Sequence, residues 1–153
     1  MNVKPKKQLG QHFLKDAGTC QKIAKQVIWT NDTRKVLEIG PGMGALSKYL
    51  WDLPEIDLWL LDVDIESIDY LRAHYPDHAD RILFGDFLRL DPQELFGTDP
   101  FIVVGNFPYN ISSQILFKCL AYRNQIPQIM GMFQKEVAVR IAQKPGTKEY
   151  GII

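Results

Sequence analysis

Hydrophobic and polar positions follow two different periods along this chain, and their succession predicts helices and strands in turn. A helical period covers residues 17–28, where apolar side chains fall at 20, 23, 24, 27 and 28. Short apolar runs of strand type follow, each closed by a turn signal and then by a helical stretch. We expect strands at 35–39, 58–61, 81–84, 101–104 and 128–133, and helices at 45–51, 66–74, from 91, at 113–122 and at 136–142.

Strands that alternate with helices at this spacing predict an α/β fold with a mostly parallel, Rossmann-like sheet and helices on both faces. A length of 153 residues fits one domain, so we expect a single domain over residues 1–153. A new apolar run starts at residues 150–153. We therefore expect the sheet to be truncated before its last strands.

The formal net charge is zero, but the charges are unevenly distributed. Residues 1–35 carry eight Lys and Arg against two acids, whereas residues 52–99 carry thirteen acids against three Arg. Residues 118–148 are basic again, with Glu136 as their one acid. This asymmetry permits a basic surface for phosphates beside an acidic region, and ordinary solvated faces explain it equally well.

Several residue classes point away from secretion, membranes and metals. Cys20 and Cys119 lie far apart without a CxxC pattern, which is typical of reduced thiols in a cytoplasmic protein. No signal-peptide pattern and no apolar run of ~20 residues is present, so we expect no membrane association. His74 and His78 are four positions apart but have no third candidate ligand, so we expect no metal site.

A glycine-rich loop follows the first strand, with glycines at 40, 42 and 44 before the next helix. Glycine allows backbone to turn sharply and to approach a ligand closely. The spacing is not GxGxxG, and Pro41 removes an N–H that a pyrophosphate would use, which argues against a dinucleotide. A mere tight turn between strand and helix is the alternative interpretation.

Two acids at the ends of the next strands favour a ligand site over a mere turn. Asp62 ends the second strand, where a carboxylate can accept hydrogen bonds from both ribose hydroxyls, and Asp64 is a competitor for that role. Asp86 ends the third strand, where it can accept from an adenine amino group with Phe87 near the ring. A nucleoside without a phosphate chain fits these groups, and S-adenosylmethionine is the obvious candidate.

The fourth strand ends in Asn106, Phe107, Pro108 and Tyr109, a sequence that suits a methyl acceptor. An adenine N6 amine is a poor nucleophile because its lone pair is delocalised into the ring. The Asn106 oxygen and a carbonyl of Phe107 or Pro108 can accept both amine hydrogens, and Tyr109 offers a stacking face. A turn capped by Asn110 or Ser112 is the alternative.

The motifs taken together resemble the small-subunit ribosomal RNA adenine dimethyltransferases, the KsgA/RsmA family. The matching segments are "LGQHFLKD" at 9–16, "VLEIGPGMGALS" at 36–47, "GDFLRLD" at 85–91, "VVGNFPYNIS" at 103–112 and "QKEVAVRIAQKPGTKEYG" at 134–151. The resemblance implies S-adenosylmethionine-dependent N6,N6-dimethylation of two adjacent adenines near the 3′ end of 16S rRNA, in ribosome biogenesis and without a metal.

The resemblance also implies roles for individual residues. The acceptor and catalytic residues would be Asn106, Phe107, Pro108 and Tyr109. The cofactor-binding residues would be Gln11, His12, Leu14, Glu38, Gly40, Gly42, Asp62, Asp86, Phe87 and Asn106. The family often has Asn at 12, Glu at 62 and Leu at 107, where this chain has His, Asp and Phe.

Two other functions compete with the small-subunit enzyme. One is the large-subunit (23S) adenine N6-methyltransferase that confers macrolide resistance, and the other is a non-catalytic ribosome-assembly factor that keeps the pocket as a relic. For the enzyme we expect a cytoplasmic monomer that acts on small-subunit rRNA or the pre-30S particle. Family members continue with a helical domain that helps hold RNA, so cofactor binding is expected of this stretch and RNA methylation by it alone is not.

Overall fold

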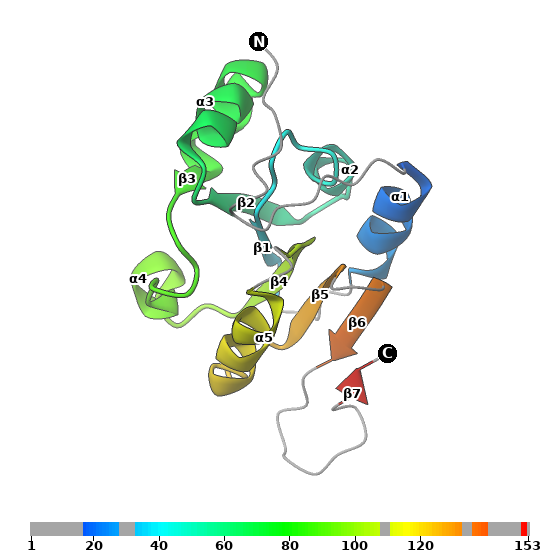
Figure 1. Ribbon diagram of the computed structural model, residues 1–153, viewed down its shortest axis with the longest axis vertical. Helices are drawn as coiled ribbons and strands as arrows, with labels where there is room; N and C mark the ends of the chain where they lie inside the picture. The colour runs from blue at the N-terminus through cyan, green and yellow to red at the C-terminus, as the bar shows by residue number, and fades with distance from the viewer. Residues whose placement is uncertain (1–16, 28–32, 108–110, 133–135, 141–150, 153) are drawn as a thin grey trace.

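A computed structural model describes residues 17–27, 33–107, 111–132, 136–140 and 151–152 of the chain (Figure 1). The elements are α1 (Ala17–Gln26), β1 (Lys35–Ile39), α2 (Ser47–Trp51), β2 (Asp57–Asp62), α3 (Ile65–His74), the 3-10 helix η2 (Pro76–Arg81), β3 (Ile82–Phe84), α4 (Pro92–Phe96), β4 (Phe101–Asn106), α5 (Ser112–Ala121), β5 (Gln128–Met132), β6 (Glu136–Arg140) and β7 (Gly151–Ile152). The sequence-based expectations for β1 to β5 and for α1, α3, α4 and α5 are confirmed within a few residues.

The strands form one seven-stranded sheet in the order β3-β2-β1-β4-β5-β6-β7. The first five strands pair in parallel, as the alternation of elements predicted. From β1 the chain proceeds outward to β2 and β3, then returns to place β4 on the other side of β1. Ligands of open α/β sheets bind at such a switch point, outside the carboxyl ends of the strands.

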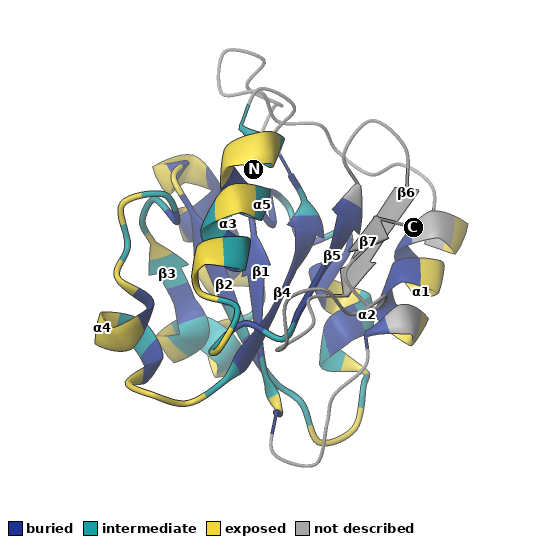
Figure 2. Ribbon diagram, turned by 90° about the horizontal axis from the view of Figure 1, so that it is seen from below, coloured by how far each residue is buried: buried dark blue, intermediate teal, exposed yellow. Residues whose placement is uncertain are grey.

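Two hydrophobic layers hold the helices against the sheet. On one face α1, α2 and α3 pack on side chains such as Val36, Leu60 and Ile102. On the other face α4 and α5 pack on Leu37, Val103 and their neighbours. Neighbouring residues of a strand point to opposite faces, so a strand buried on both sides must be apolar throughout. Figure 2 shows the central strands buried and the outer faces of α3 and α4 exposed.

The predicted helix at 136–142 is wrong, because the chain forms strand β6 there (Glu136–Arg140). β6 pairs antiparallel with β5 over its whole length and in turn pairs antiparallel with β7. Val137 and Val139 are β-branched and recur every second residue, a pattern that suits a strand better than a helix. Within the described residues, the sheet therefore continues past β5 with the two antiparallel strands β6 and β7.

The helix expected at 45–51 is shorter than predicted. α2 begins at Ser47, since residues 42–46 are taken up by the turns of the glycine loop. Within the described part of the chain, no helix has the length and apolar character that a membrane crossing requires.

Candidate functional site

The register of the parallel strands brings four strand ends to one level. Ile39 of β1 lies opposite Leu61 on one side and Gly105 on the other. The next residues, Gly40, Asp62 and Asn106, therefore emerge side by side from neighbouring strands. Asp62 pairs with Phe84 of β3, and Asp86 follows two positions later. The structure thus gathers the glycine loop, two acids and an amide at the carboxyl edge of the sheet.

The glycine loop turns through conformations that side chains rarely adopt. Gly40, Gly42 and Gly44 have φ angles of 70°, 57° and 89°. A Cβ added at Gly44 would lie 3.2 Å from Leu71 Cδ2, so the loop also passes close to α3. The Gly40 N–H donates to the Leu61 carbonyl (2.9 Å), which ties the start of the loop to β2. The glycines are required by the path of the backbone, and this path leaves the loop without side chains at those positions.

Asp62 lies directly beneath this loop and is 2% exposed. Its Oδ2 accepts from the Gly42 N–H (3.1 Å) and its Oδ1 accepts from the Asp64 N–H (2.9 Å). Burial raises the pKa of the Asp62 carboxyl, and these main-chain hydrogen bonds oppose the rise. Each carboxylate oxygen has a second lone pair, so the group can accept further hydrogen bonds from a ligand.

Asp64, the competitor for the ribose role, caps helix α3. Its carboxylate accepts from the Glu66 N–H (3.2 Å) and from the Ser67 hydroxyl (3.0 Å), and the residue is buried. Side chains of this type satisfy the free N–H groups of a first helical turn. Asp64 is therefore the cap of a helix, a role that Asp62 does not have.

Glu38 is buried on β1 under the glycine loop. The Ser47 hydroxyl donates to its Oε1 over 2.6 Å, which connects β1 to the start of α2. Burial raises the pKa of the Glu38 carboxyl to about 8. The hydrogen bond from Ser47 opposes this rise in pKa, and the nearby Asp62 carboxylate adds to it. Glu38 is 1% exposed and connects β1 to the helix after the loop, and its predicted contact with the cofactor stays a prediction.

Asp86 begins a tight turn after β3. Its Oδ1 accepts from the Leu88 N–H (3.0 Å), and its main-chain carbonyl accepts from the N–H groups of Arg89 and Leu90 (3.0 Å each). The Arg89 guanidinium lies 3.8 Å from Oδ2. A hollow of about 540 Å³ adjoins this turn, and Phe84, which is 59% exposed, is among the side chains that line it.

Phe87 follows Asp86 and lies in the hydrophobic core. Its side chain is 2% exposed and packs in the hydrophobic cluster between the sheet, α4 and α5. The ring thus belongs to the core, and its predicted place near the adenine of the cofactor stays a prediction.

Phe107 anchors the start of the acceptor segment in the core. Its ring is 1% exposed and lies against Gly105 and Gly131 on β4 and β5. A Cβ added at Gly131 would lie 2.4 Å from Phe107 Cε2 and 2.1 Å from the Gly105 carbonyl oxygen. Sequence reasoning missed Gly131, although an isolated glycine inside a strand signals a close approach of this kind.

Several predicted site residues lie outside the described part of the chain: Gln11, His12, Leu14, Pro108 and Tyr109. Asn110, a predicted cap, also lies outside it. α5 begins at Ser112, and its N-cap position is Ile111, which supplies no side-chain hydrogen bond. The predicted capping by Ser112 is therefore not what the structure shows.

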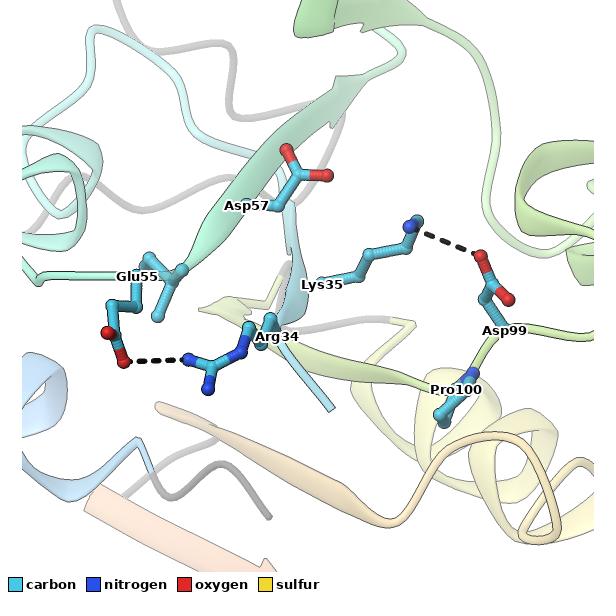
Figure 3. A pocket seen from close by; sticks show the side chains of 7 residues that line it. Arg34, Lys35, Glu55, Asp57, Asp99 and Pro100 are labelled. Atoms are coloured by element: carbon cyan, nitrogen blue, oxygen red, sulfur yellow. Dashed lines mark hydrogen bonds and ion pairs between the residues drawn. The ribbon is translucent and has the colours of Figure 1, made fainter. Parts of the chain in front are cut away.

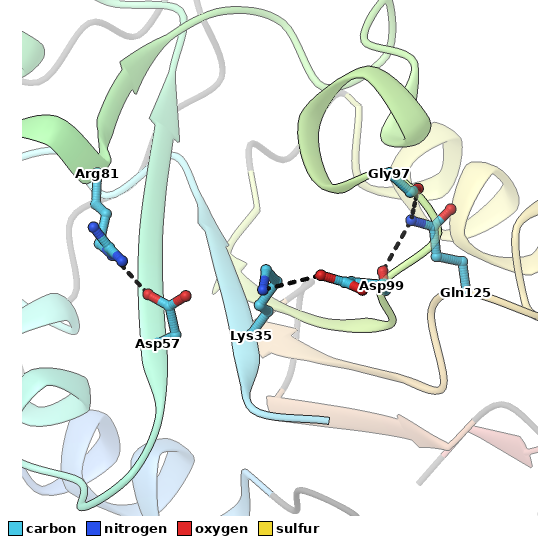
Figure 4. A network of polar contacts seen from close by, with 6 residues as sticks. All are labelled: Lys35, Asp57, Arg81, Gly97, Asp99 and Gln125. Atoms are coloured by element: carbon cyan, nitrogen blue, oxygen red, sulfur yellow. Dashed lines mark hydrogen bonds and ion pairs between the residues drawn. The ribbon is translucent and has the colours of Figure 1, made fainter. Parts of the chain in front are cut away.

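A second hollow, of about 510 Å³, opens at the opposite edge of the sheet (Figure 3). Its charged side chains are paired with each other, Arg34 with Glu55 (2.9 Å) and Lys35 with Asp99 (3.2 Å). Figure 4 shows the adjoining contacts, in which Arg81 binds Asp57 and Gln125 donates to the carbonyls of Gly97 and Asp99. These pairs fasten the amino-terminal ends of the strands, far from the predicted chemistry.

The possible metal ligands among the described residues do not form a cluster. Among the described residues, no three His, Cys, Asp or Glu side chains are placed to hold a metal ion. Cys20 and Cys119 are buried cysteines outside any disulfide, and burial raises the pKa of Cys119 to about 12. The His74 ring stacks on Tyr70 with centroids 3.9 Å apart, and the His78 ring stacks on Trp51.

The fold and the site together define the class. A parallel sheet with a glycine loop after β1, acids after β2 and β3, and an asparagine after β4 is the arrangement of a Rossmann-like methyltransferase. Residues 2–153 match the family model described as "Ribosomal RNA adenine dimethylase". The chain belongs to this family.

Relatives and solved structures agree with this assignment. The chain is 54% identical over 154 residues to "Ribosomal RNA small subunit methyltransferase A" of Parabacteroides distasonis, covering 99% of the chain and 56% of the relative. It is 50% identical over 151 residues to the protein of that name from Flavobacterium johnsoniae, covering 99% and 57%. The crystal structure of the 23S rRNA methyltransferase ErmE aligns with a TM-score of 0.64 at 31% identity, over 78% of the chain and 47% of that structure. The chain thus spans a little over half the length of these curated relatives.

Proposed function

We propose that residues 1–153 form the cofactor-binding methyltransferase domain of a small-subunit rRNA adenine dimethyltransferase. The observation that carries the proposal is the common level of Gly40, Asp62 and Asn106 at the switch point between β1 and β4, with Asp86 at the end of β3. Its activity would be N6,N6-dimethylation of two adjacent adenines near the 3′ end of 16S rRNA. The enzyme would be a cytoplasmic monomer, and its partner would be small-subunit rRNA or the pre-30S particle.

The described residues fit S-adenosylmethionine. Asp62 would accept hydrogen bonds from the ribose hydroxyls, and Asp86 would accept from the adenine amine with Oδ2. The glycine loop keeps Cβ atoms away from the path of the ligand. When bound, the cofactor supplies a methyl group on a positively charged sulfur. Gln11, His12 and Leu14 are proposed as further contacts.

On the acceptor side, the chain has to hold an adenine amine with its lone pair directed at the methyl group. We assign this task to the Asn106 side-chain oxygen and to the main-chain carbonyl of Phe107 or Pro108. Both acceptors favour a pyramidal nitrogen, and Tyr109 would stack on the base, a contact worth ~1–3 kcal/mol. The amine loses its proton only after methyl transfer, so the site needs acceptors and not a general base.

The similarity values favour the small subunit over the large subunit as the substrate. Identity to the relatives named as small-subunit methyltransferases is 50–54%, against 31% to the 23S rRNA methyltransferase ErmE. The glycine loop, Asp86 and Asn106 are all present, which argues against an assembly factor with a relic pocket.

Calorimetric titration of the chain with S-adenosylmethionine tests the cofactor assignment. We expect saturable binding, weakened about tenfold or more by Asp62→Ala, because a ligand that loses a hydrogen bond to a charged group loses ~1.5–3 kcal/mol. Lys22→Met, an exposed change on α1, is the matched control and leaves affinity unchanged. Unaltered affinity in Asp62→Ala would remove the ribose assignment, and a chain that binds no cofactor would overturn the proposed function.

Transfer of a labelled methyl group to unmethylated small ribosomal subunits tests the reaction, with the Parabacteroides distasonis relative as positive control. In a protein that methylates these subunits, the Asn106→Ala change is expected to lower the rate about a hundredfold or more, because it removes an acceptor for the amine. Full methylation by the Asn106→Ala protein would show that the amine is not held as proposed.

A further inference from the structure

Lys118 of α5 reaches across to the turn that carries Asp86. Its Nζ donates to the main-chain carbonyls of Phe87 and Leu90. These two carbonyls belong to the turn whose N–H groups already bond back to Asp86. The turn is therefore closed on itself by Asp86 and fastened to α5 by Lys118.

Aromatic rings and carboxylates near Lys118 restrict the position of its ammonium group. The ammonium lies 5.0 Å from the centre of the Phe87 ring and 5.9 Å from that of Tyr122, so aromatic faces surround much of it. Burial lowers the pKa of Lys118, while the nearby Asp86 and Asp91 carboxylates oppose that shift. A half-buried cation between aromatic rings, carbonyls and carboxylates has few alternative positions.

The element that carries Lys118 also follows the acceptor segment. α5 begins at Ser112, shortly after Asn106 and Phe107, and its buried side chains Ile115 and Cys119 pack on the same face of the sheet as Phe107. A shift of α5 along the sheet would therefore move the Asp86 turn with it. Lys118 joins these two parts of the site by hydrogen bonds.

We infer that Lys118 is a positioning residue that holds the Asp86 carboxylate in place to recognise the 6-amino group of the cofactor's adenine. The inference rests on the proposed function, since it assigns a support to one contact of that site. It predicts that Lys118 affects selectivity for the amino group and not only the stability of the fold. A lysine that merely satisfied two carbonyls would affect all ligands of the site equally.

The test compares S-adenosylhomocysteine with its analogue lacking the 6-amino group, each titrated calorimetrically into the whole chain. The measured quantity is the ratio of the two dissociation constants, which does not depend on the folded fraction. The wild-type chain should prefer the amino ligand about tenfold, as expected for a hydrogen bond to a charged group. Lys118→Met should reduce this preference about threefold or more, and Lys118→Arg, which retains donors and charge, should restore most of it.

Two further variants test whether Lys118 acts on the ligand preference through Asp86. Asp86→Asn should lose most of the preference, and adding Lys118→Met to it should change the preference no further, because the two residues act as one unit. Lys22→Met on α1 is the control and should behave as wild type.

An unchanged preference in Lys118→Met, or an equal weakening of both ligands, would overturn the inference and leave the proposed function standing. A Lys118→Arg chain that behaves like Lys118→Met would also overturn it. A wild-type chain that binds both ligands equally would remove the Asp86 assignment together with the inference. A wild-type chain that binds neither would overturn the proposed function itself.

Discussion

At the scale of single residues, Glu38 shows how a buried acid can make stability depend on pH. Its carboxyl is buried with only the Ser47 hydroxyl as a described hydrogen-bond partner, and its pKa is about 8 in the folded chain against 4.5 for an exposed glutamate. Between these values the folded chain keeps a proton that the unfolded chain has released. Raising the pH through this range therefore favours unfolding.

The resulting prediction concerns Glu38→Gln. For the wild type, we expect the free energy of unfolding to fall as pH rises from about 4.5 to about 8, by up to ~4 kcal/mol at 1.36 kcal/mol per pH unit. Glutamine keeps an acceptor for Ser47 and does not titrate, so the variant should lose most of this slope. Urea unfolding at a series of pH values measures it. Equal slopes in both proteins would show that Glu38 ionises normally, whereas a small residual slope reports on Asp62.

A second residue-scale prediction concerns Gly131. Gly131→Ala places a methyl group 2.1 Å from the Gly105 carbonyl oxygen and 2.4 Å from the Phe107 ring, so strand or ring must move. We expect a loss of about 3 kcal/mol or more in the free energy of unfolding, as for severe overpacking. Gly97→Ala is the control, since a Cβ there meets nothing within 4 Å and only its backbone conformation (φ 62°, ψ −129°) is unfavourable for a side chain, at ~1–3 kcal/mol. Similar losses in both variants would contradict the packing argument.

At the scale of elements, the caps of α3 and α4 separate two acids that look alike in sequence. Asp64 and Asp91 both accept from an N–H of the first helical turn. Asp64 is buried and also bonds Ser67, whereas Asp91 is exposed. The same capping motif therefore has different energetic weight at the two helices.

We expect Asp64→Ala to lower the free energy of unfolding by ~2 kcal/mol and Asp91→Ala by ~1 kcal/mol or less. Buried capping groups leave unsatisfied donors when removed, while exposed ones are replaced by water. Denaturant unfolding of the two variants side by side measures the difference. If Asp91→Ala costs as much as Asp64→Ala, burial is not what sets the strength of these caps.

The elements also show what the sequence could and could not predict. Buried parallel strands such as 101–106 were predictable because their apolar runs end at turn signals, and the strand-end acids follow from the same pattern. Strand 136–140 was misassigned although Val137 and Val139 recur with the period of a strand, and its pairing with β5 shows which structure forms. Lys118 was missed since its partners lie on another element, far away in sequence. At Gly131 the glycine signals a close approach, but the sequence does not show that its partner is Phe107.

At the scale of the whole molecule, binding at the carboxyl edge should stabilise the entire fold. At a ligand concentration of about 100 times the dissociation constant, the free energy of unfolding should rise by ~2.7 kcal/mol. For a chain of 153 residues this corresponds to a rise of roughly 5–10 °C in melting temperature. Thermal unfolding with and without S-adenosylhomocysteine measures the shift.

Asp86→Asn provides the comparison for this prediction. At the same ligand concentration its melting temperature should rise by clearly less than that of the wild type, because its affinity is lower. Its own melting temperature without ligand serves as the baseline. Equal shifts would mean that the ligand is held without Asp86.

The adjacency of β1 and β4 in the sheet also has a consequence for how the chain reaches its folded state. Gly40 and Asn106 are distant in sequence and meet only when these two strands pair. Pairing of strands so far apart closes a long loop, a step that is slow in folding because its entropy is lost before contacts form. Cofactor affinity should therefore appear late during refolding, after helices have formed. A ligand added to a refolding chain would thus report the moment at which the central strands join.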